Sequence, residues 1–298
     1  MPPGFFGHSI KESFVRAMKN KISTILLIVV LLTGLSLLLY PTVSNYWNSM
    51  HSSQAVAEYD KNIRDLNEET YQKLLSDAVQ YNNELYVNGV GFSLPQELKK
   101  TYSELLNIGG NGIMGYIEIP SINVQLPIYH GTDDSVLQIA VGHLDWSSLP
   151  VGGENTHCIL SGHRGLPSAK LFTNLDKLAV GDTFVIRVLS EVLTYEVDKI
   201  LIVEPHEVDS LVPEAGRDLC TLTTCTPYGI NSHRLLVRGH RIETVDNSSA
   251  RVVSDAVRIE PLVIAPIAAV PLLAIPVIVV FAFGSKKKKH GRGDSIEK

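Results

Sequence analysis

Cys225 stands where a nucleophilic thiol is expected, at the end of a strand-like segment. The segment TLTTC (residues 221–225) is rich in Thr and Leu, and the turn-forming residues TPYG follow it directly. Arg234 comes nine positions after Cys225, and His163 lies far upstream in the sequence SGHRG. The thiolate is the attacking form of cysteine, so a working cysteine needs a base or a positive charge nearby. These three residue types together predict nucleophilic acyl transfer.

The two partners of Cys225 suit different parts of that chemistry. His163 can take and return a proton, because imidazole titrates near neutral pH. Arg234 follows a turn, and residues on either side of an antiparallel turn face each other. Its guanidinium stays charged and offers a fork of donors, which suits a carbonyl oxygen that becomes an oxyanion. Arg238, four residues later on the same strand face, is the rival for this role.

The sequence blocks around these residues resemble the sortase family and, within it, class C, the pilin-polymerising sortases. The family signature TLxTC is met in full at residues 221–225, and the class C extension TPYGIN, then HRLLVRG, follows it. The blocks NGIMGYIEIP, LPIYHG and LSGHRGLPSAKLFT, which begin at residues 111, 126 and 160, are similar to that family in the same order. The resemblance extends over residues 107–242.

The resemblance implies a cysteine transpeptidase that works without a cofactor or a metal. Cys225 would be the nucleophile, His163 the acid and base, and Arg234 the positive group at the oxyanion, while Thr224 would contact the substrate. Members of the family cleave an LPXTG-like sorting signal between Thr and Gly, hold a thioacyl intermediate and pass it to an amine. For class C the amine is a lysine of another pilin subunit. The implied partners are pilins or surface proteins with such signals.

Two other functions remain open at this point. A housekeeping sortase would anchor surface proteins to cell-wall peptide, but it normally has one membrane segment and a different stretch after the cysteine. A non-catalytic scaffold of the pilus base would not need Cys225, His163 and Arg234 together. The sequence contains no phosphate-binding loop and no Cys-x-x-Cys zinc spacing. We expect no nucleic-acid partner.

Two uncharged stretches near the ends of the chain predict membrane helices. Residues 22–40, at about 1.5 Å per residue, nearly cross the ~30 Å hydrocarbon core of a bilayer. Residues 261–284 form the second stretch, whose prolines a membrane helix tolerates. Basic residues flank both stretches on their outer sides, which predicts cytoplasmic termini and an extracellular catalytic domain. The length of the first run and the lack of a small-x-small site favour an anchor over a cleaved signal peptide.

The pattern between these stretches changes from helical to strand-like. Residues 55–85 predict one or two amphipathic helices, and residues 96–106 predict a short helix. From residue 114 onward, short runs rich in Val, Ile and Tyr alternate with turn residues, which predicts a closed or nearly closed β-barrel of seven or eight strands. The predicted strands are residues 114–119, 124–129, 156–161, 183–187, 193–197, 200–203, 219–225 and 234–244, and further helical segments are expected near residues 135–141 and 169–175.

These features predict a mostly β protein in four parts. The expected fold is the closed eight-stranded β-barrel of sortases with short helices, N-terminal amphipathic helices and two flanking transmembrane helices. The four parts are residues 1–45 (cytoplasmic N-terminus and transmembrane helix), 46–106 (helical region with a candidate lid loop), 107–246 (catalytic barrel) and 247–298 (linker, second transmembrane helix and basic cytoplasmic tail).

The stretch that matches the class C lid departs from the family pattern. The usual lid carries an Asp-Pro-aromatic anchor that enters the active site, but GVGFSLPQEL (residues 89–98) has no such triplet. Phe92 is its only aromatic residue and is the candidate lid residue. The chain has three cysteines, too few for a disulfide scaffold. Cys158 and Cys220 are predicted to be small buried residues, and the sequence leaves open whether they pair.

Overall fold

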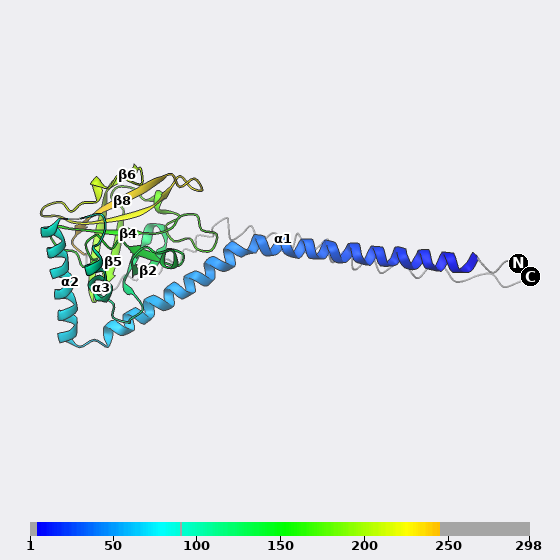
Figure 1. Ribbon diagram of the computed structural model, residues 1–298, viewed down its shortest axis with the longest axis horizontal. Helices are drawn as coiled ribbons and strands as arrows, with labels where there is room; N and C mark the ends of the chain where they lie inside the picture. The colour runs from blue at the N-terminus through cyan, green and yellow to red at the C-terminus, as the bar shows by residue number, and fades with distance from the viewer. Residues whose placement is uncertain (1–4, 90, 245–298) are drawn as a thin grey trace, which may run out of the picture. The chain divides into compact units, whose positions relative to one another are not determined.

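The described part of the chain begins with three α-helices and continues as a β-barrel (Figure 1). This computed structural model describes residues 5–89 and 91–244, with side chains from residue 22 onward. The described residues fall into two compact units that divide between Val43 and Ser44. The helices are α1 (Phe5–Arg64), α2 (Glu68–Asn88) and α3 (Gln96–Glu104).

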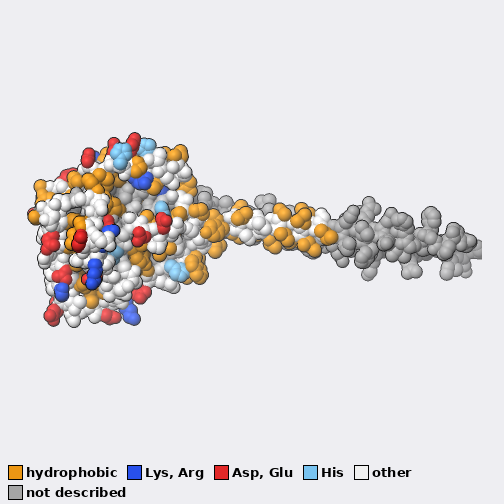
Figure 2. Space-filling model, viewed as in Figure 1, with side chains coloured by type: hydrophobic (Ala, Val, Ile, Leu, Met, Phe, Trp, Pro, Cys, Tyr) orange, Lys and Arg blue, Asp and Glu red, His pale blue; other side chains and the backbone are white. Residues whose placement is uncertain are grey.

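The first part of α1 is long and apolar enough to cross a membrane. The candidate span is assigned to Ile22–Arg64, whose most apolar window has a mean hydropathy of 2.7 and no buried residue. Figure 2 shows apolar side chains spread along the exposed surface of this helix. The predicted membrane segment at residues 22–40 lies within it, and among the described residues it is the one helix of this kind. The second predicted span, residues 261–284, lies outside the described residues.

Residues 55–85, predicted as one or two helices, are divided between two helices. The end of α1 and the whole of α2 are separated at Asn67, whose side chain accepts a hydrogen bond from the Thr70 amide at 2.8 Å and so caps α2. Gly89, with a φ of 79°, ends α2. The predicted helix at residues 96–106 is α3, which ends at Glu104.

Eight strands form a closed barrel, which confirms the predicted fold. Their order around the barrel is β1-β2-β3-β4-β7-β8-β6-β5. Two pairings, β2 with β3 and β4 with β7, are parallel, and the others are antiparallel. The strands are β1 (Ile113–Ile119), β2 (Val124–His130), β3 (Val141–His143), β4 (Thr156–Ser161), β5 (Thr183–Val188), β6 (Glu191–Val203), β7 (Asp218–Thr226) and β8 (His233–Ile242).

Two predictions differ from the structure in detail. The helix expected near residues 135–141 is present but short, as α4 (Asp134–Leu137), and the segment ends in β3, which was not predicted. A strand of three residues is too short to show alternation in the sequence. The two runs at 193–197 and 200–203 are one strand, β6. Its register shifts between Val197 and Lys199, and such a bulge reverses the alternation of side chains.

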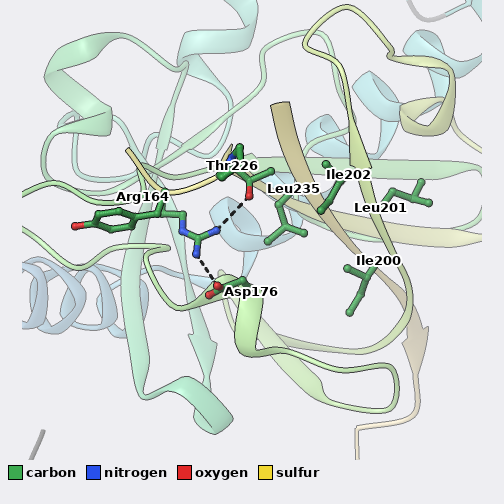
Figure 3. A pocket seen from close by; sticks show the side chains of 9 residues that line it. Arg164, Asp176, Ile200, Leu201, Ile202, Thr226 and Leu235 are labelled. Atoms are coloured by element: carbon green, nitrogen blue, oxygen red, sulfur yellow. Dashed lines mark hydrogen bonds and ion pairs between the residues drawn. The ribbon is translucent and has the colours of Figure 1, made fainter. Parts of the chain in front are cut away.

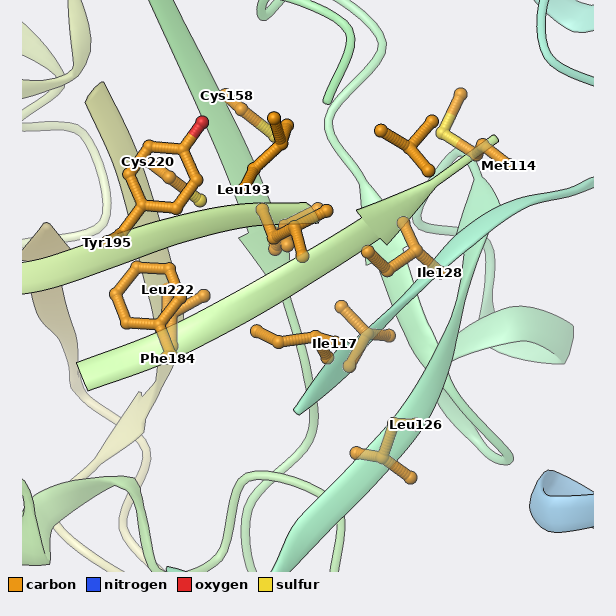
Figure 4. Packing of buried hydrophobic residues seen from close by; sticks show 14 of the residues in the cluster. Met114, Ile117, Leu126, Ile128, Cys158, Phe184, Leu193, Tyr195, Cys220 and Leu222 are labelled. Carbon is orange, nitrogen blue, oxygen red and sulfur yellow. The ribbon is translucent and has the colours of Figure 1, made fainter. Parts of the chain in front are cut away.

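The barrel interior is filled by alternate residues of every strand (Figure 4). Phe184 and Tyr195 stack with ring centroids 5.4 Å apart, and both are fully buried. Gly239 is required beside them, since a Cβ there would lie 2.7 Å from the Phe184 ring. Cys158 and Cys220 face each other across β4 and β7 as buried free thiols. Their predicted burial is confirmed, and no disulfide bond joins them in the structure.

Buried hydrogen bonds fasten the helices to the barrel. The Tyr59 hydroxyl of α1 donates to the Met114 carbonyl at 2.9 Å and accepts from the Leu189 amide at 2.7 Å. The Asn82 side chain of α2 bonds both the amide and the carbonyl of Leu149, at 2.7 and 3.1 Å. Because buried polar groups cost free energy when they lose a partner, these contacts hold α2 and the C-terminal end of α1 on the barrel.

Candidate active site

Cys225 and Arg234 lie directly opposite each other on neighbouring strands. The antiparallel pairing of β7 with β8 joins the two residues in register. Leu222 and Val237 point into the core, so strand alternation places Cys225 and Arg234 on the outer face of the barrel. Side chains opposite each other in an antiparallel pair have Cβ atoms about 4.5–5.5 Å apart. The predicted return of the chain therefore places Arg234 next to Cys225 on the same face of the sheet.

The segment that carries His163 follows β4, which is paired in parallel with β7 on its other side. Each β4 residue faces the β7 residue 62 positions later, as Ser161 faces Thr223 at the end of β4. The Gly162 amide donates to the Thr223 carbonyl at 3.1 Å and extends this ladder by one residue. If the same register continued by two residues, His163 would lie beside Cys225, because neighbouring strands lie about 4.8 Å apart. The two strand pairings thus direct the segments that carry the three predicted residues to one end of β7.

Thr224 is placed behind Cys225, on the inner face of the barrel. Its side chain is only 2% exposed, and its hydroxyl donates to the Gly162 carbonyl at 2.7 Å. Gly162 directly precedes His163. Thr224 therefore ties the segment that carries the histidine to the strand that carries the cysteine.

The segment after His163 is held by its main chain. The His163 carbonyl accepts from the Phe172 amide, and the Gly165 amide donates to the Thr173 hydroxyl, both at 3.1 Å. Gly165 has a φ of +79°, and a Cβ there would lie 2.9 Å from the Tyr228 ring. No hydrogen bond joins the His163 imidazole to another described residue. The place of the ring is therefore set by its backbone.

Arg234 and Arg238, two of the three arginines of β8, have different surroundings. Arg238 donates to Asp198 at 2.9 and 3.0 Å and to Glu214 at 2.6 Å, and Arg217 bonds both carboxylates as well. Although burial raises the pKa of Asp198, the bonds from both arginines hold it below its usual value. Hydrogen bonding to Arg217 likewise lowers the pKa of Glu214. The charge of Arg238 is thus already compensated.

Arg234 has no carboxylate partner among the described residues. Its Nη1 donates to two main-chain carbonyls, those of His233 at 3.2 Å and Asn231 at 3.4 Å. A guanidinium that lies opposite the thiol with an uncompensated charge can donate to an oxyanion that forms there. The geometry thus favours Arg234 over Arg238.

An apolar surface lies next to these groups on the outer face. Ile159 of β4 and Leu236 of β8 are buried there against Leu211 from the connection between β6 and β7. We call this set the outer-face cluster. The partly buried residues packed against it are Leu144, Trp146, Leu201, Val203 and Val208. The three residues of the cluster cover one another, and only the partly buried residues around them are accessible.

Phe92, the candidate lid residue, lies against the outer-face cluster. Its ring meets the Trp146 ring edge to face, with centroids 5.4 Å apart at 84°. The Phe92 side chain remains 47% exposed. The structure therefore places the loop beside the apolar surface through one aromatic contact.

Two other histidines, His157 and His130, have partners that give them a structural role. His157 contacts the Val212 carbonyl at 3.0 Å and the Thr221 hydroxyl at 2.7 Å. Burial lowers the pKa of His157 to about 4, so it is neutral near pH 7. His130 contacts the carbonyls of Gly112 and Leu105. Within residues 5–89 and 91–244, no group of three or more His, Cys, Asp or Glu residues gathers as a metal site.

One arginine beside the site was not found from the sequence. The Arg164 side chain is only 10% exposed and forms an ion pair with Asp176. Its Nη1 donates to the Thr226 hydroxyl at 3.4 Å, and its Cζ lies 5.9 Å from the centroid of the Tyr228 ring. Figure 3 shows this arginine at the wall of a pocket of about 520 Å³. Its place directly after His163 was the available signal, but nothing in the sequence pairs it with Asp176.

Comparisons with known proteins agree with the geometry of the site. A family model described as a sortase domain matches residues 117–242. Sortase D of Bacillus subtilis (strain 168) is 34% identical over 131 residues, which cover 43% of this chain. The chain spans 63% of the length of that curated relative.

Solved structures match over nearly their whole length. The structure of sortase C1 from Streptococcus agalactiae is 47% identical, with a TM-score of 0.63, and the match covers 64% of this chain and 99% of that chain. Sortase C of Streptococcus pneumoniae is 40% identical, with a TM-score of 0.57, and the match covers 64% of this chain and 97% of that chain. Together with the signature blocks and the closed eight-stranded barrel, these matches show that the chain belongs to the sortase family, with class C sortases as structural neighbours.

Proposed function

We propose that this protein is a cysteine transpeptidase that cleaves an LPXTG-like sorting signal and transfers the acyl group to a lysine amine of another pilin subunit. The observation that carries the proposal is the register of Cys225 between Arg234 on β8 and the continuation of β4 that bears His163. A nucleophile, a proton carrier and an uncompensated cation on one outer face are the groups that acyl transfer requires.

The first half of the reaction forms a thioacyl enzyme. The Cys225 thiolate attacks the carbonyl carbon of the Thr–Gly bond, and Arg234 donates to the oxyanion. The C–N bond then breaks while His163 protonates the leaving amine. In the second half the lysine amine attacks the thioacyl carbon and loses a proton to His163. The C–S bond breaks, and the new amide and the free thiolate result.

The surroundings of Cys225 support this use of the site. The partly buried residues around the outer-face cluster offer apolar surface for the Leu and Pro of a sorting signal. Thr224 supports the chemistry by holding Gly162, and its contact with the substrate stays a prediction. Transfer between pilins is favoured by the class C extension after Cys225. The similar sortase C of Streptococcus pneumoniae was described for its insight into catalysis and pilin substrate specificity.

The alternative is transfer to cell-wall peptide. The two functions differ in the amine that accepts the acyl group, so an experiment that offers different acceptors distinguishes them. The ectodomain incubated with candidate pilins should produce covalent ladders of pilin subunits, whereas a housekeeping enzyme would join the sorting signal to a cell-wall peptide amine. A non-catalytic scaffold would do neither, and its Cys225 would not react selectively with a thiol probe.

We further propose that the protein is held in the cell membrane with both termini in the cytoplasm and the barrel outside. The exposed apolar part of α1 and the basic residues on the outer sides of both apolar stretches support this topology.

Replacing the thiol tests the nucleophile. We expect Cys225→Ala to abolish cleavage of a sorting-signal peptide and thioacyl formation, because a methyl group cannot form the thioester. The measurements are peptide cleavage and intact mass. Circular dichroism should show an unchanged fold, since the side chain lies on the outer face. Turnover near that of the wild type in a folded variant would contradict the assignment.

Arg234 and Arg238 form a matched pair of variants on β8. We expect Arg234→Ala to lower kcat/KM by about 10²–10³-fold, because an oxyanion donor is lost. Arg238→Ala should lower kcat/KM far less but reduce the thermal unfolding midpoint, because Asp198 and Glu214 lose a partner. Greater loss of activity in Arg238→Ala than in Arg234→Ala would reverse the assignment.

The contact of Phe92 tests whether the loop closes the site. An aromatic pair contributes about 0.5–1.5 kcal/mol, so we expect Phe92→Ala to change the rate of Cys225 alkylation by less than about tenfold. Tyr86→Ala, an exposed aromatic residue of α2, is the control. A larger acceleration confined to Phe92→Ala would show a working lid.

Thiol labelling in intact cells tests the topology. In a Cys225→Ala background, a cysteine introduced in the lysine run 286–289 should resist an impermeant maleimide until the cells are permeabilised. Val180→Cys, at a position with an exposed side chain on the barrel, should be labelled at once. Immediate labelling of the lysine run would overturn the proposed orientation.

A further inference from the structure

We propose that Arg164 is a positioning residue that holds the His163 imidazole at the Cys225 thiol. This inference rests on the proposed function, because it assigns Arg164 a task in the chemistry of His163. Arg164 follows His163 in the chain, and Thr226, to which it donates, follows Cys225. The arginine thus joins the residue after the base to the residue after the nucleophile.

Three partners from different segments fix the Arg164 side chain. Its Nη2 pairs with Asp176, between the histidine segment and β5, and its Nη1 donates to the Thr226 hydroxyl. The face of its guanidinium lies over the Tyr228 ring, in the turn between β7 and β8. Figure 3 shows the guanidinium directed at Asp176 and Thr226. A charged fork that is nine-tenths buried and bonded to two segments keeps a loop in one place.

The position of the His163 imidazole depends on the contacts of Arg164 more than the position of a histidine in a Ser-His-Asp triad would. In a Ser-His-Asp triad a carboxylate bonds the second ring nitrogen and orients the base. Here no described residue bonds the His163 ring, so its place follows from the backbone around it. Gly162 is held by β7 on one side. On the other side Arg164 adds its side-chain contacts to the bonds of the Phe172 amide and the Thr173 hydroxyl. A displacement of 1 Å can cost about 10²-fold in rate.

The charge of Asp176 allows the arginine to be buried beside a reacting thiolate. The ion pair neutralises Arg164, so the guanidinium holds the loop and leaves Arg234 as the free cation of the site. Lysine would keep the charge at Arg164 but offers no planar fork, and it cannot reach two partners and cover a ring in the same way. The fork of Arg164, rather than its charge, is therefore what the site requires.

Substitution with chemical rescue tests the inference. We expect Arg164→Ala to lower kcat for peptide cleavage roughly 10²-fold with little change in KM, because the outer-face cluster is untouched. Arg164→Lys should recover only part of the activity. Millimolar guanidinium should restore kcat in Arg164→Ala, because the pocket of about 520 Å³ beside the arginine opens a path to Asp176 and Thr226. Asp176→Asn should lower kcat in the same sense.

The controls separate this inference from the proposed function. Arg187→Ala removes an ion pair with Glu118 elsewhere on the barrel and should leave kcat unchanged. His163→Ala sets the floor, and guanidinium should not rescue it. If the wild type forms no thioacyl intermediate, the proposed function fails. If the wild type is active, the test concerns Arg164 alone. Arg164 has no positioning role if the Arg164→Ala and Asp176→Asn variants both fold and both keep the kcat of the wild type. The same conclusion follows if each variant loses kcat only in proportion to a loss of its unfolding temperature. In that case guanidinium would restore neither kcat nor the unfolding temperature.

Discussion

The parallel pairing of β4 with β7 is the constraint on which the site depends. It places a residue far upstream beside the nucleophile, with each β4 residue facing the β7 residue 62 positions later. Parallel neighbours need a long crossover connection, and here that connection supplies Asp176, Phe172 and the Arg164 loop. A shift of one residue in this register would turn every β7 side chain to the other face relative to its β4 partner. Closure of the barrel excludes such a shift, because β7 is also paired with β8.

Alternation along β7 divides its residues between two tasks. Leu222 and Thr224 face inward, where Leu222 joins the core and Thr224 bonds Gly162. Cys225 faces outward at the end of the same strand. The nucleophile is therefore carried by a rigid element, and its immediate neighbour in the chain holds the segment of the base. Precise placement of this kind lowers the entropic part of the barrier to reaction.

Electrostatic compensation decides which arginine of β8 is free. Arg234 and Arg238 share one strand face, so alternation does not distinguish them. Asp198 lies at the irregularity of β6, and it pairs with Arg238 and Arg217. The same ion pairs fix the connection that brings Leu211 to the outer-face cluster. This network thus compensates the charge of Arg238 and leaves Arg234 without a carboxylate partner among the described residues.

The sequence by itself predicted the barrel class, the apolar stretch of α1 and the three candidate site residues, because these depend on local periodicity, hydropathy and contiguous motifs. Cys225 and Arg234 could also be paired from the sequence, since one short turn separates their strands. Only the tertiary structure decided the placement of His163, the inward face of Thr224 and the link from Arg164 to Asp176. It also joined the two runs of β6 and revealed β3. Each of these depends on strand register, a bulge or contacts between distant segments, and local sequence carries no record of which distant segment will be the partner.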